Sequence, residues 1–324
     1  MKQILIMMAT WNGEKYLREQ LDSILGQSHT AWHLVIQDDG STDRTRAIVK
    51  EYCERDGRIT LTENSSGVHG AYCNFYSLIS RCKSGADFDY YMFCDQDDIW
   101  YRDKIEVFLK AMEGYDGTPA LAYADMRICD ATGTVTLESI NDVRRTDQLD
   151  AVNAFFIHRV RGCNLMMNRA LFRLAPAVDV SRKETAALSH DSLYTKFAVA
   201  CGSLVYIPEA TMNYRRHDEN VTLDSYGKTT TWHAIRRIFS PKGLAEAHAK
   251  VYNQSLTAIR LMRTLPLTQE QRERLDTIER CIRKGGPAAI AYLNRQHTRL
   301  GGTAENLARK TILLIGLHRP FLEK

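Results

Sequence analysis

The sequence predicts an α/β protein with a helical region at its C-terminal end. Three observations support this class. Short apolar runs alternate with amphipathic segments over much of the 324 residues, polar side chains follow several of these runs, and strand signals disappear after Thr230. Strands and helices that alternate at crossover spacing favour a parallel sheet covered on both faces. We therefore expect one α/β domain over residues 1–227 and a basic helical region over residues 228–324.

The first part of the chain reads as four strand–helix units. Gln3 to Ala9 is almost continuously apolar, as in a buried strand, and Leu17, Leu21 and Ile24 then recur on one helical face. The same patterns predict further strands over 32–37, 59–62 and 90–94, and helices over 13–25, about 41–55, 72–81 and 101–112.

The alternation is looser after Pro119. We expect strands over 120–127, 164–167, 203–207 and 211–215, and helices over 146–159 and 190–200. In the tail, the pattern predicts helices over 244–265, 268–284 and 303–315, separated by Pro266 and by a Gly-Gly-Pro segment over 285–287.

Composition excludes several classes of protein. Apolar residues make up 44% and charged residues 25% of the chain, which excludes wholesale disorder and a collagen-like repeat. The eight cysteines include no C-x-x-C pair, which indicates reduced core thiols instead of disulfides or a zinc site. No apolar run approaches the roughly 18–20 residues of a membrane span, and the N-terminal segment becomes polar too early for a signal peptide. We therefore expect a cytoplasmic protein.

Charge divides the chain into two parts. Residues 1–227 carry 25 Lys and Arg against 32 Asp and Glu, a net charge of −7, whereas residues 228–324 carry 18 against 7, a net charge of +11. Carboxylates in short clusters suit a bound metal cation. A basic tail suits an anionic partner such as phospholipid or a phosphorylated acceptor, although a solvated helical face explains the same charge.

The segment Asp95-Gln96-Asp97-Asp98 is the sharpest chemical signal. It follows a very apolar strand, and residues two apart in an extended segment face the same side, so Asp95 and Asp97 present their carboxylates together. Mg²⁺ and Mn²⁺ bind through one or two carboxylates plus substrate phosphates. An EF-hand is excluded because Trp100 occupies the sixth position, where glycine is required. The alternative is a strand-to-helix loop in which Asp98 caps the following helix.

A second polar segment, Asp38-Asp39-Gly40-Ser41, follows another predicted strand. In an open parallel sheet, ligands bind beyond the carboxyl ends of the strands, where both acidic segments are expected to meet. A carboxylate here could accept hydrogen bonds from a nucleobase or a ribose hydroxyl. The alternative is a turn that caps the next helix.

The order and spacing of four segments resemble the family 2 glycosyltransferases of the GT-A fold. The resemblance covers about residues 1–227 and rests on residues 9–13 (ATWNG), 38–43 (DDGSTD), 64–67 (NSSG) and 94–100 (CDQDDIW). It implies a Rossmann-like mixed sheet with helices on both faces. The DQDDIW wording also resembles the bacterial rhamnosyltransferase branch, whose members use dTDP-L-rhamnose to build cell-wall or O-antigen polysaccharide.

The resemblance implies a role for each matching residue at the strand ends. Thr10 and Asn12 would line the nucleotide pocket, and Asp39 would contact the pyrimidine ring. Asp95 would lie near the ribose and the donor sugar. Asp97 would bind the divalent ion, Mn²⁺ or Mg²⁺.

Further roles are implied later in the chain. Asp191 would be the general base that takes the proton of the acceptor hydroxyl, although an acidic residue there could merely stabilise the start of a helix. His217 would bind the metal or a phosphate, and Arg215 or Arg216 would neutralise the diphosphate, unless this segment is a solvated loop. Trp100 could stack on a sugar ring or simply pack in the core.

The implied reaction is an inverting displacement. It would transfer a sugar, best L-rhamnose from dTDP-L-rhamnose, to a hydroxyl of a growing, lipid-linked bacterial polysaccharide. The alternatives are a UDP-hexose donor on the same fold, or a non-catalytic protein that binds sugar nucleotides or polysaccharide. A nucleotidyltransferase is disfavoured because Gly13 stands alone after the first strand, without a glycine-rich, lysine-bearing phosphate loop.

The basic tail leaves its partner open. Leu307, Thr311, Leu314 and Ile315 fall near one helical face, which suits peripheral attachment to the inner face of the cell membrane or a helical dimer contact. Nucleic acid is disfavoured, because the positive charge is spread along helices without interleaved aromatic residues.

Overall fold

The computed structural model describes residues 1–182, 187–218 and 241–323. These residues form a mixed sheet with helices on both faces, which confirms the expected α/β fold class. The strands are β1 (Ile4–Thr10), β2 (Trp32–Asp38), β3 (Ile59–Glu63), β4 (Tyr90–Cys94), β5 (Ile99–Trp100), β6 (Ala120–Cys129), β7 (Val135–Leu137), β8 (Leu165–Asn168) and β9 (Ser203–Arg215).

The α-helices of the described residues fall into two sets along the chain. Those around the sheet are α1 (Leu17–Leu25), α2 (Thr45–Arg55), α3 (Ala71–Lys83), α4 (Lys104–Ala111), α5 (Asn141–Arg144), α6 (Arg169–Leu174) and α8 (His190–Cys201). Those of the tail are α10 (Pro241–Met262), α11 (Gln269–Lys284), α12 (Gly286–Arg295) and α13 (Thr303–Ile315). No helix in these parts of the chain combines the length and the apolar character needed to cross a bilayer.

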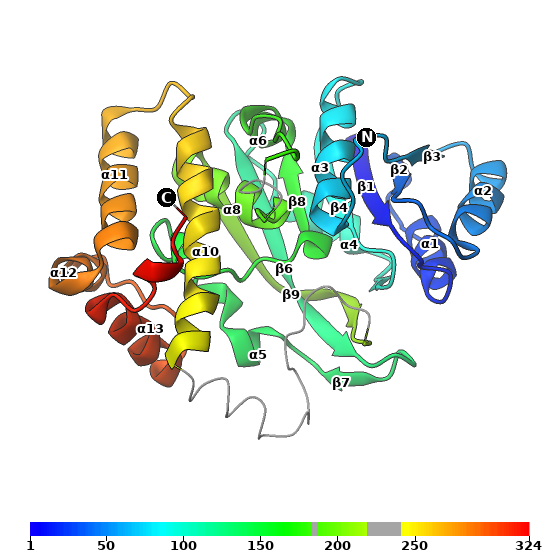
Figure 1. Cartoon of the computed structure of the whole chain (residues 1–324). Coiled ribbons are helices and arrows are strands. Elements are labelled where there is room, and N and C mark those ends of the chain that lie inside the picture. The colour runs from blue at the N-terminus through cyan, green and yellow to red at the C-terminus, as the bar shows by residue number, and fades with distance from the viewer. Residues whose placement is uncertain (183–186, 219–240, 324) are drawn as a thin grey trace.

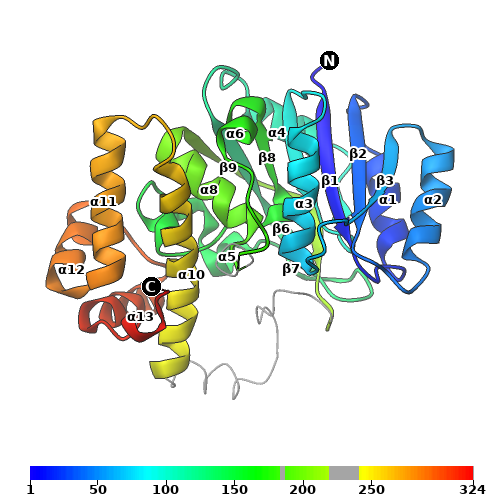
Figure 2. The same ribbon diagram turned by 45° about the horizontal axis from the view of Figure 1, so that its top comes forward.

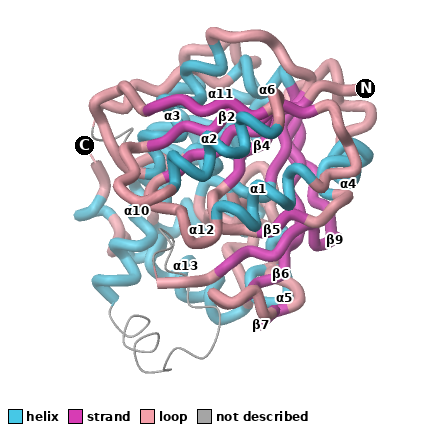
Figure 3. The backbone as a smooth tube through the Cα atoms, turned by 90° about the vertical axis from the view of Figure 1, so that its right-hand side faces the viewer, coloured by secondary structure: helices cyan, strands magenta, loops and turns pink. Residues whose placement is uncertain are grey.

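The sheet has the order β3-β2-β1-β4-β8-β6-β9-β5, with β7 paired to β6. Its first four strands are parallel, but β8 runs antiparallel to both β4 and β6, so the sheet is mixed, as the resemblance implied. Figure 3 shows how strongly the sheet twists between its two ends. Thr10 lies opposite Asp38, and Met8 lies opposite Cys94, so the polar segments after β1, β2 and β4 meet at one edge.

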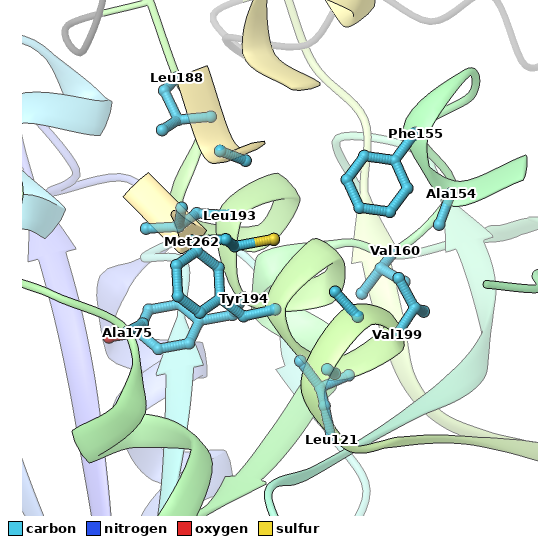
Figure 4. Close-up of a cluster of buried hydrophobic side chains, with 14 of the residues drawn as sticks. Leu121, Ala154, Phe155, Val160, Ala175, Leu188, Leu193, Tyr194, Val199 and Met262 are labelled. Atoms are coloured by element: carbon cyan, nitrogen blue, oxygen red, sulfur yellow. The ribbon is translucent and has the colours of Figure 1, made fainter. Parts of the chain in front are cut away.

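A hydrophobic core lies on each face of the sheet, because the buried strands alternate apolar side chains between the two faces. One core packs α1, α2 and α4 against the sheet. The other core packs α3 and α8 there and continues into the tail. Figure 4 shows this continuation, in which Met262 of α10 lies among Leu193 and Tyr194 of α8.

The tail helices lie together on the side of the molecule opposite the N-terminal strand–helix units (Figures 1 and 2). Tyr252, Ile259 and Leu313 are each 1% exposed or less, within the same core as the sheet residue Leu121. Burial of apolar surface against α8 therefore fixes α10 to the α/β part. The expected boundary between residues 227 and 228 lies outside the described residues.

Three expected elements differ in the structure. Residues 146–159 form two short 3₁₀ turns (Thr146–Gln148 and Asn153–Phe155) instead of one helix, because Asp150 and Asn153 bond to nearby backbone groups. The two expected strands over 203–207 and 211–215 are the single strand β9, whose pairing with β6 shifts register midway. The expected separator at 285–287 contains the start of the helix α12, which begins at Gly286 and has proline in its first turn.

Candidate active site

A large cleft opens at the edge where the polar strand ends meet. Its volume is about 1300 Å³, and its walls come from the ends of β1, β2 and β4, the start of α8, and the tail helices α10 and α13. Seven of the ten expected site residues line it: Thr10, Asn12, Asp39, Asp95, Asp97, Asp191 and His217.

Thr10 and Asn12 order the wall at the end of β1. The Thr10 hydroxyl donates to Asp38 Oδ2 at 3.0 Å, while Asn12, at a φ of 47°, accepts from the Thr42 backbone N–H at 2.9 Å. The Asn12 backbone N–H also donates to Ser41 Oγ. These bonds join the turn after β1 to the turn after β2, so the two strand ends form one continuous surface.

Asp39 holds a loop over the cleft. Its Oδ1 accepts from Asn64 Nδ2 at 2.6 Å and lies 2.9 Å from His69 Nδ1, and its Oδ2 accepts from the Gly70 backbone N–H at 2.8 Å. The residue is 7% exposed. Asp39 therefore organises the loop before α3 through internal hydrogen bonds, and its contact with a pyrimidine base stays a prediction.

The acidic loop, residues 95–98, follows β4. Burial, then the charges of Asp97 and Asp191, raise the pKa of Asp95 to about 7. Asp97 Oδ2 lies 2.7 Å from His217 Nε2, so the segment that follows β9 contacts this loop. Asp98 is fully buried, and its Oδ1 accepts from the Arg215 backbone N–H at 3.0 Å. Such a concentration of carboxylates is stabilised by a cation.

Two groups of side chains could hold a metal ion. Ligand atoms of Asp95, Asp98 and Cys163 lie within 4.8 Å of one another. Burial raises the pKa of the Cys163 thiol, however, and a neutral thiol is a poor ligand for a hard ion. The Asp97–His217 pair beside Asp95 offers carboxylate oxygens at the cleft surface, which suit Mn²⁺ or Mg²⁺, together with one imidazole nitrogen, a ligand that suits softer divalent ions than Mg²⁺. The structure therefore fits a divalent ion on this pair.

Asp191 lies at the start of α8 and faces the cleft. Its Oδ2 accepts from the Gly162 backbone N–H at 3.1 Å and lies 3.3 Å from His158 Nε2, and its Oδ1 accepts from the Ser192 N–H at 2.6 Å. Burial alone would raise the pKa of Asp191, but the His158 imidazole and the hydrogen bonds outweigh it and hold this pKa well below its usual range. Asp191 is therefore an ionised, firmly oriented carboxylate.

Arg215 and Arg216 do not line the cleft, so the expectation that they neutralise a diphosphate is corrected. The Arg215 guanidinium is 1% exposed. Its Nε donates to the Asp97 carbonyl at 2.9 Å, its Nη1 donates to the Ala131 carbonyl, and its Nη2 pairs with Glu19. Arg215 thus supports the acidic loop from behind. Arg216 is half-buried, and its backbone N–H donates to the Cys129 carbonyl.

Trp100 also lies away from the cleft. It is 3% exposed in the core, and the buried Lys104 ammonium lies 4.4 Å from the centre of its ring. The expectation that Trp100 stacks on a sugar ring is therefore corrected, because its ring faces are covered by protein.

The opposite wall of the cleft contains side chains that were not expected there. We call Arg144 of α5, Arg159, Lys250 of α10 and Arg309 of α13 the basic wall. His158, which pairs with Asp191, lies in the same segment as Arg159. The net charge of the tail was a signal for Lys250 and Arg309 alone. No motif assigns Arg144 or Arg159, and the segment before Arg159 was expected to be helical.

Comparisons with known proteins agree with this geometry. The sequence model of the glycosyl transferase family 2 matches residues 5–173. The dTDP-rhamnosyl transferase RfbG of Shigella flexneri is 31% identical over 218 residues, which cover 66% of this chain and 72% of that protein. The UDP-Glc:alpha-D-GlcNAc-diphosphoundecaprenol beta-1,3-glucosyltransferase WfgD of Escherichia coli is 30% identical over 107 residues, or 33% of this chain and 40% of that protein.

Two solved structures share the fold at low sequence identity. S. aureus TarS 1-349 in complex with UDP-GlcNAc superposes with a TM-score of 0.52 at 14% identity, covering 92% of this chain and 93% of that one. The mannosyltransferase PcManGT from Pyrobaculum calidifontis, in complex with GDP-Man and Mn2+, gives a TM-score of 0.51 at 16% identity, covering 96% and 87%. From its family match, the RfbG similarity and its GT-A-type fold, this chain belongs to glycosyl transferase family 2.

Proposed function

We propose that this glycosyltransferase is inverting and metal-dependent, and that it moves L-rhamnose from dTDP-L-rhamnose to a hydroxyl of a lipid-linked bacterial surface polysaccharide. One observation carries the proposal: a single cleft brings together the ends of β1 and β2, the acidic loop and Asp191. These groups suit a nucleotide, a diphosphate with its metal, and an acceptor hydroxyl in turn.

The sugar donor would bind along the strand ends. Thr10 and Asn12 would line the nucleotide pocket and Asp39 would contact the base, either directly or through the loop that it holds. Asp95 would lie beside the ribose and the sugar. The choice of dTDP-L-rhamnose is supported by the 31% identity to RfbG, which is described as a dTDP-rhamnosyl transferase.

Asp97 and His217, with Asp95 beside them, would hold Mn²⁺ or Mg²⁺. When bound, the ion offsets the charge that develops on the departing diphosphate, a contribution of several kcal/mol. Arg215 would help indirectly, because its contact with the Asp97 carbonyl fixes the position of the acidic loop.

Asp191 would take the proton of the acceptor hydroxyl. As that O–H bond breaks, the oxygen forms a bond to the anomeric carbon, and the bond from this carbon to the diphosphate oxygen breaks with its electron pair. A single displacement inverts the configuration at the anomeric carbon. The His158 ring and the Gly162 N–H would orient the Asp191 carboxylate before the acceptor arrives.

A lipid-linked acceptor is supported by two features. WfgD, by its description, glycosylates a sugar on diphosphoundecaprenol. The outer surface of α13 and the residues that follow it exposes Leu307, Ile315 and Leu317, at 68%, 60% and 38% respectively. In a tail with a net charge of +11, these side chains suit contact with an anionic membrane from its cytoplasmic face, or a dimer of two such surfaces.

The test is a transfer assay with purified protein. We expect release of dTDP from dTDP-L-rhamnose in the presence of Mn²⁺ or Mg²⁺, and its loss in EDTA. Turnover of UDP-glucose instead would support the alternative donor. The opposite result is a protein that binds a sugar nucleotide but neither hydrolyses it nor transfers its sugar to any of the lipid-linked acceptors tested. That result would support a non-catalytic binding protein and contradict the proposal.

A further inference from the structure

Arg159 and Arg309 of the basic wall carry more positive charge than the one carboxylate that they share balances. Arg159 Nη2 lies 2.8 Å from Glu305 Oε2, and Arg309 Nη2 lies 2.8 Å from Glu305 Oε1. Two guanidinium groups thus share one carboxylate. Lys250 adds a third charge on an exposed side chain of the neighbouring helix, where Glu246 lies one turn away.

Arg159 is the most buried member of the wall. Its side chain is 3% exposed, and its Nε is buried without a hydrogen-bond partner among the described residues. Burial, and then the like charge of Arg309, lower the pKa of Arg159 despite the pairing with Glu305. A buried guanidinium that lines a cleft with an unsatisfied N–H is a position where an anionic oxygen is stabilised.

The basic wall is joined to Asp191 through a short segment of chain. His158 contacts Asp191, the next residue is Arg159, and the Gly162 N–H donates to Asp191. The acidic loop, by contrast, concentrates carboxylates around the expected metal. A ligand whose hydroxyl reaches Asp191 therefore has cations on one side and the sugar donor on the other.

Resting on the proposed function, we propose that the basic wall binds a phosphate or diphosphate group carried by the acceptor, through Arg159, Lys250 and Arg309. These three side chains hold the anion directly, without a metal. The acceptor hydroxyl then lies at Asp191, at the other end of the same molecule. The phosphate contact would select phosphorylated acceptors from neutral glycans.

The test measures binding of farnesyl diphosphate, with farnesol as the uncharged probe, in EDTA so that the metal-dependent site is inactive. We expect the protein to bind farnesyl diphosphate and not farnesol. Lys250→Gln and Arg309→Gln should each weaken this binding about tenfold, as expected for loss of one charge-assisted contact. Lys242→Gln, which removes an exposed lysine of the same helix outside the cleft, is the matched control and should bind like the unmodified protein.

Inorganic pyrophosphate separates the two sources of the anion. If farnesyl diphosphate binds more than about tenfold more tightly than pyrophosphate, the natural anion is a lipid-linked phosphate. If the two bind equally, it is a soluble phosphate. Both results support the phosphate contact. Unchanged affinity in Lys250→Gln and Arg309→Gln would overturn it. Loss of binding in Asp97→Asn would also overturn it, because the probe would then occupy the sugar-donor side.

Two controls keep the outcomes separate. If a thermal melt shows that Arg309→Gln is unfolded, Lys250→Gln decides the question, because Lys250 is exposed. Hydrolysis of dTDP-L-rhamnose by the unmodified protein is measured in a separate assay with Mn²⁺. Its failure contradicts the proposed function, whereas failure of the farnesyl diphosphate binding contradicts only the phosphate contact.

Discussion

The two walls of the cleft differ in charge and in how they are held. On the strand-end wall, the Gly70 N–H fixes Asp39 and the His217 ring contacts Asp97. Asp95 is a third carboxylate of this wall, and burial and the charge of Asp97 raise its pKa. On the basic wall, Arg159 and Arg309 are fixed by a single shared carboxylate. The carboxylates of the strand-end wall can bind an anionic ligand only through a cation, whereas the cationic side chains of the basic wall can bind it directly. On the two proposals above, one cleft would therefore bind two anions, one through a metal ion and one through direct contacts.

The largest effect on transfer is expected at the proposed metal site of the strand-end wall. Asp97→Asn removes a charge that faces His217 in the proposed metal site, and we expect transfer to fall by about 1000-fold or more. The rate of nucleotide release from the sugar donor measures this, with circular dichroism to verify folding. Full activity in Asp97→Asn would remove the metal role from this residue and weaken the contrast between the walls.

Between the walls, Asp191→Asn should lower transfer by about 100-fold or more, because an amide cannot accept the acceptor proton. The affinity for the sugar donor, measured by calorimetry, should stay near that of the unmodified protein, since Asp191 is proposed to serve the acceptor. A loss of donor affinity as large as the loss of transfer would instead assign Asp191 to the donor site on the strand-end wall.

A stability difference is expected in the tail. His248 of α10 is 2% exposed, both ring nitrogens lack a partner among the described residues, and burial followed by the charge of Arg309 lowers its pKa to about 3. The unfolded chain, with a pKa near 6.5, binds the proton more readily, so this contribution is complete above about pH 6.5 and is lost as the pH falls towards 3. The loss between pH 7 and pH 5 is about 2 kcal/mol.

Urea unfolding at pH 7 and pH 5 tests this. His248→Leu should reduce the acid-induced loss of unfolding free energy by most of that amount. His33→Leu, at an exposed position in β2, is the control and should retain the loss. If His248→Leu is as acid-sensitive as the unmodified protein, the acid sensitivity belongs to the sheet side, where burial also lowers the pKa of His190 to about 4.

The smallest effect is expected at Asp39. Asp39→Asn keeps the shape of the side chain but weakens its bonds to His69 and the Gly70 N–H, so the loop should be less ordered. We expect the KM for the sugar donor to rise about tenfold with little change in kcat. Asp103→Asn, at an exposed position outside the cleft, should leave both constants unchanged. An unaltered KM in Asp39→Asn would separate this loop from the donor.

The strand-end wall could be predicted from sequence because its residues follow strands directly. Thr10 and Asp95 each end or follow an apolar run, and parallel pairing alone brings such ends together. Arg215 shows the limit of this reasoning: a charged residue at a strand end can point behind the loop as well as into the cleft, and only packing decides.

The basic wall could not be predicted, because its members meet only through tertiary packing. Arg159 and Arg309 lie far apart in the sequence and converge because α10 and α11 dock on α8, while α12 holds α13 beside them. Local hydrogen bonds of Asp150 and Asn153 also break the helix that periodicity predicted before Arg159. Apolar periodicity indicates the helices of the tail but not the face that each presents to the cleft.

Helix α13 carries Glu305 and Arg309 on its inner side and Leu307 and Ile315 on its outer side. The two sides belong to one helix of 13 residues. Binding of a partner to the outer side would therefore also fix the position of Glu305 and Arg309 on the inner side. A membrane or protein surface that binds Leu307 would therefore also set the distance between that surface and the cleft. If Leu307 and Ile315 contact a membrane, the diameter of one helix, about 10–12 Å, would then separate that membrane from the cleft.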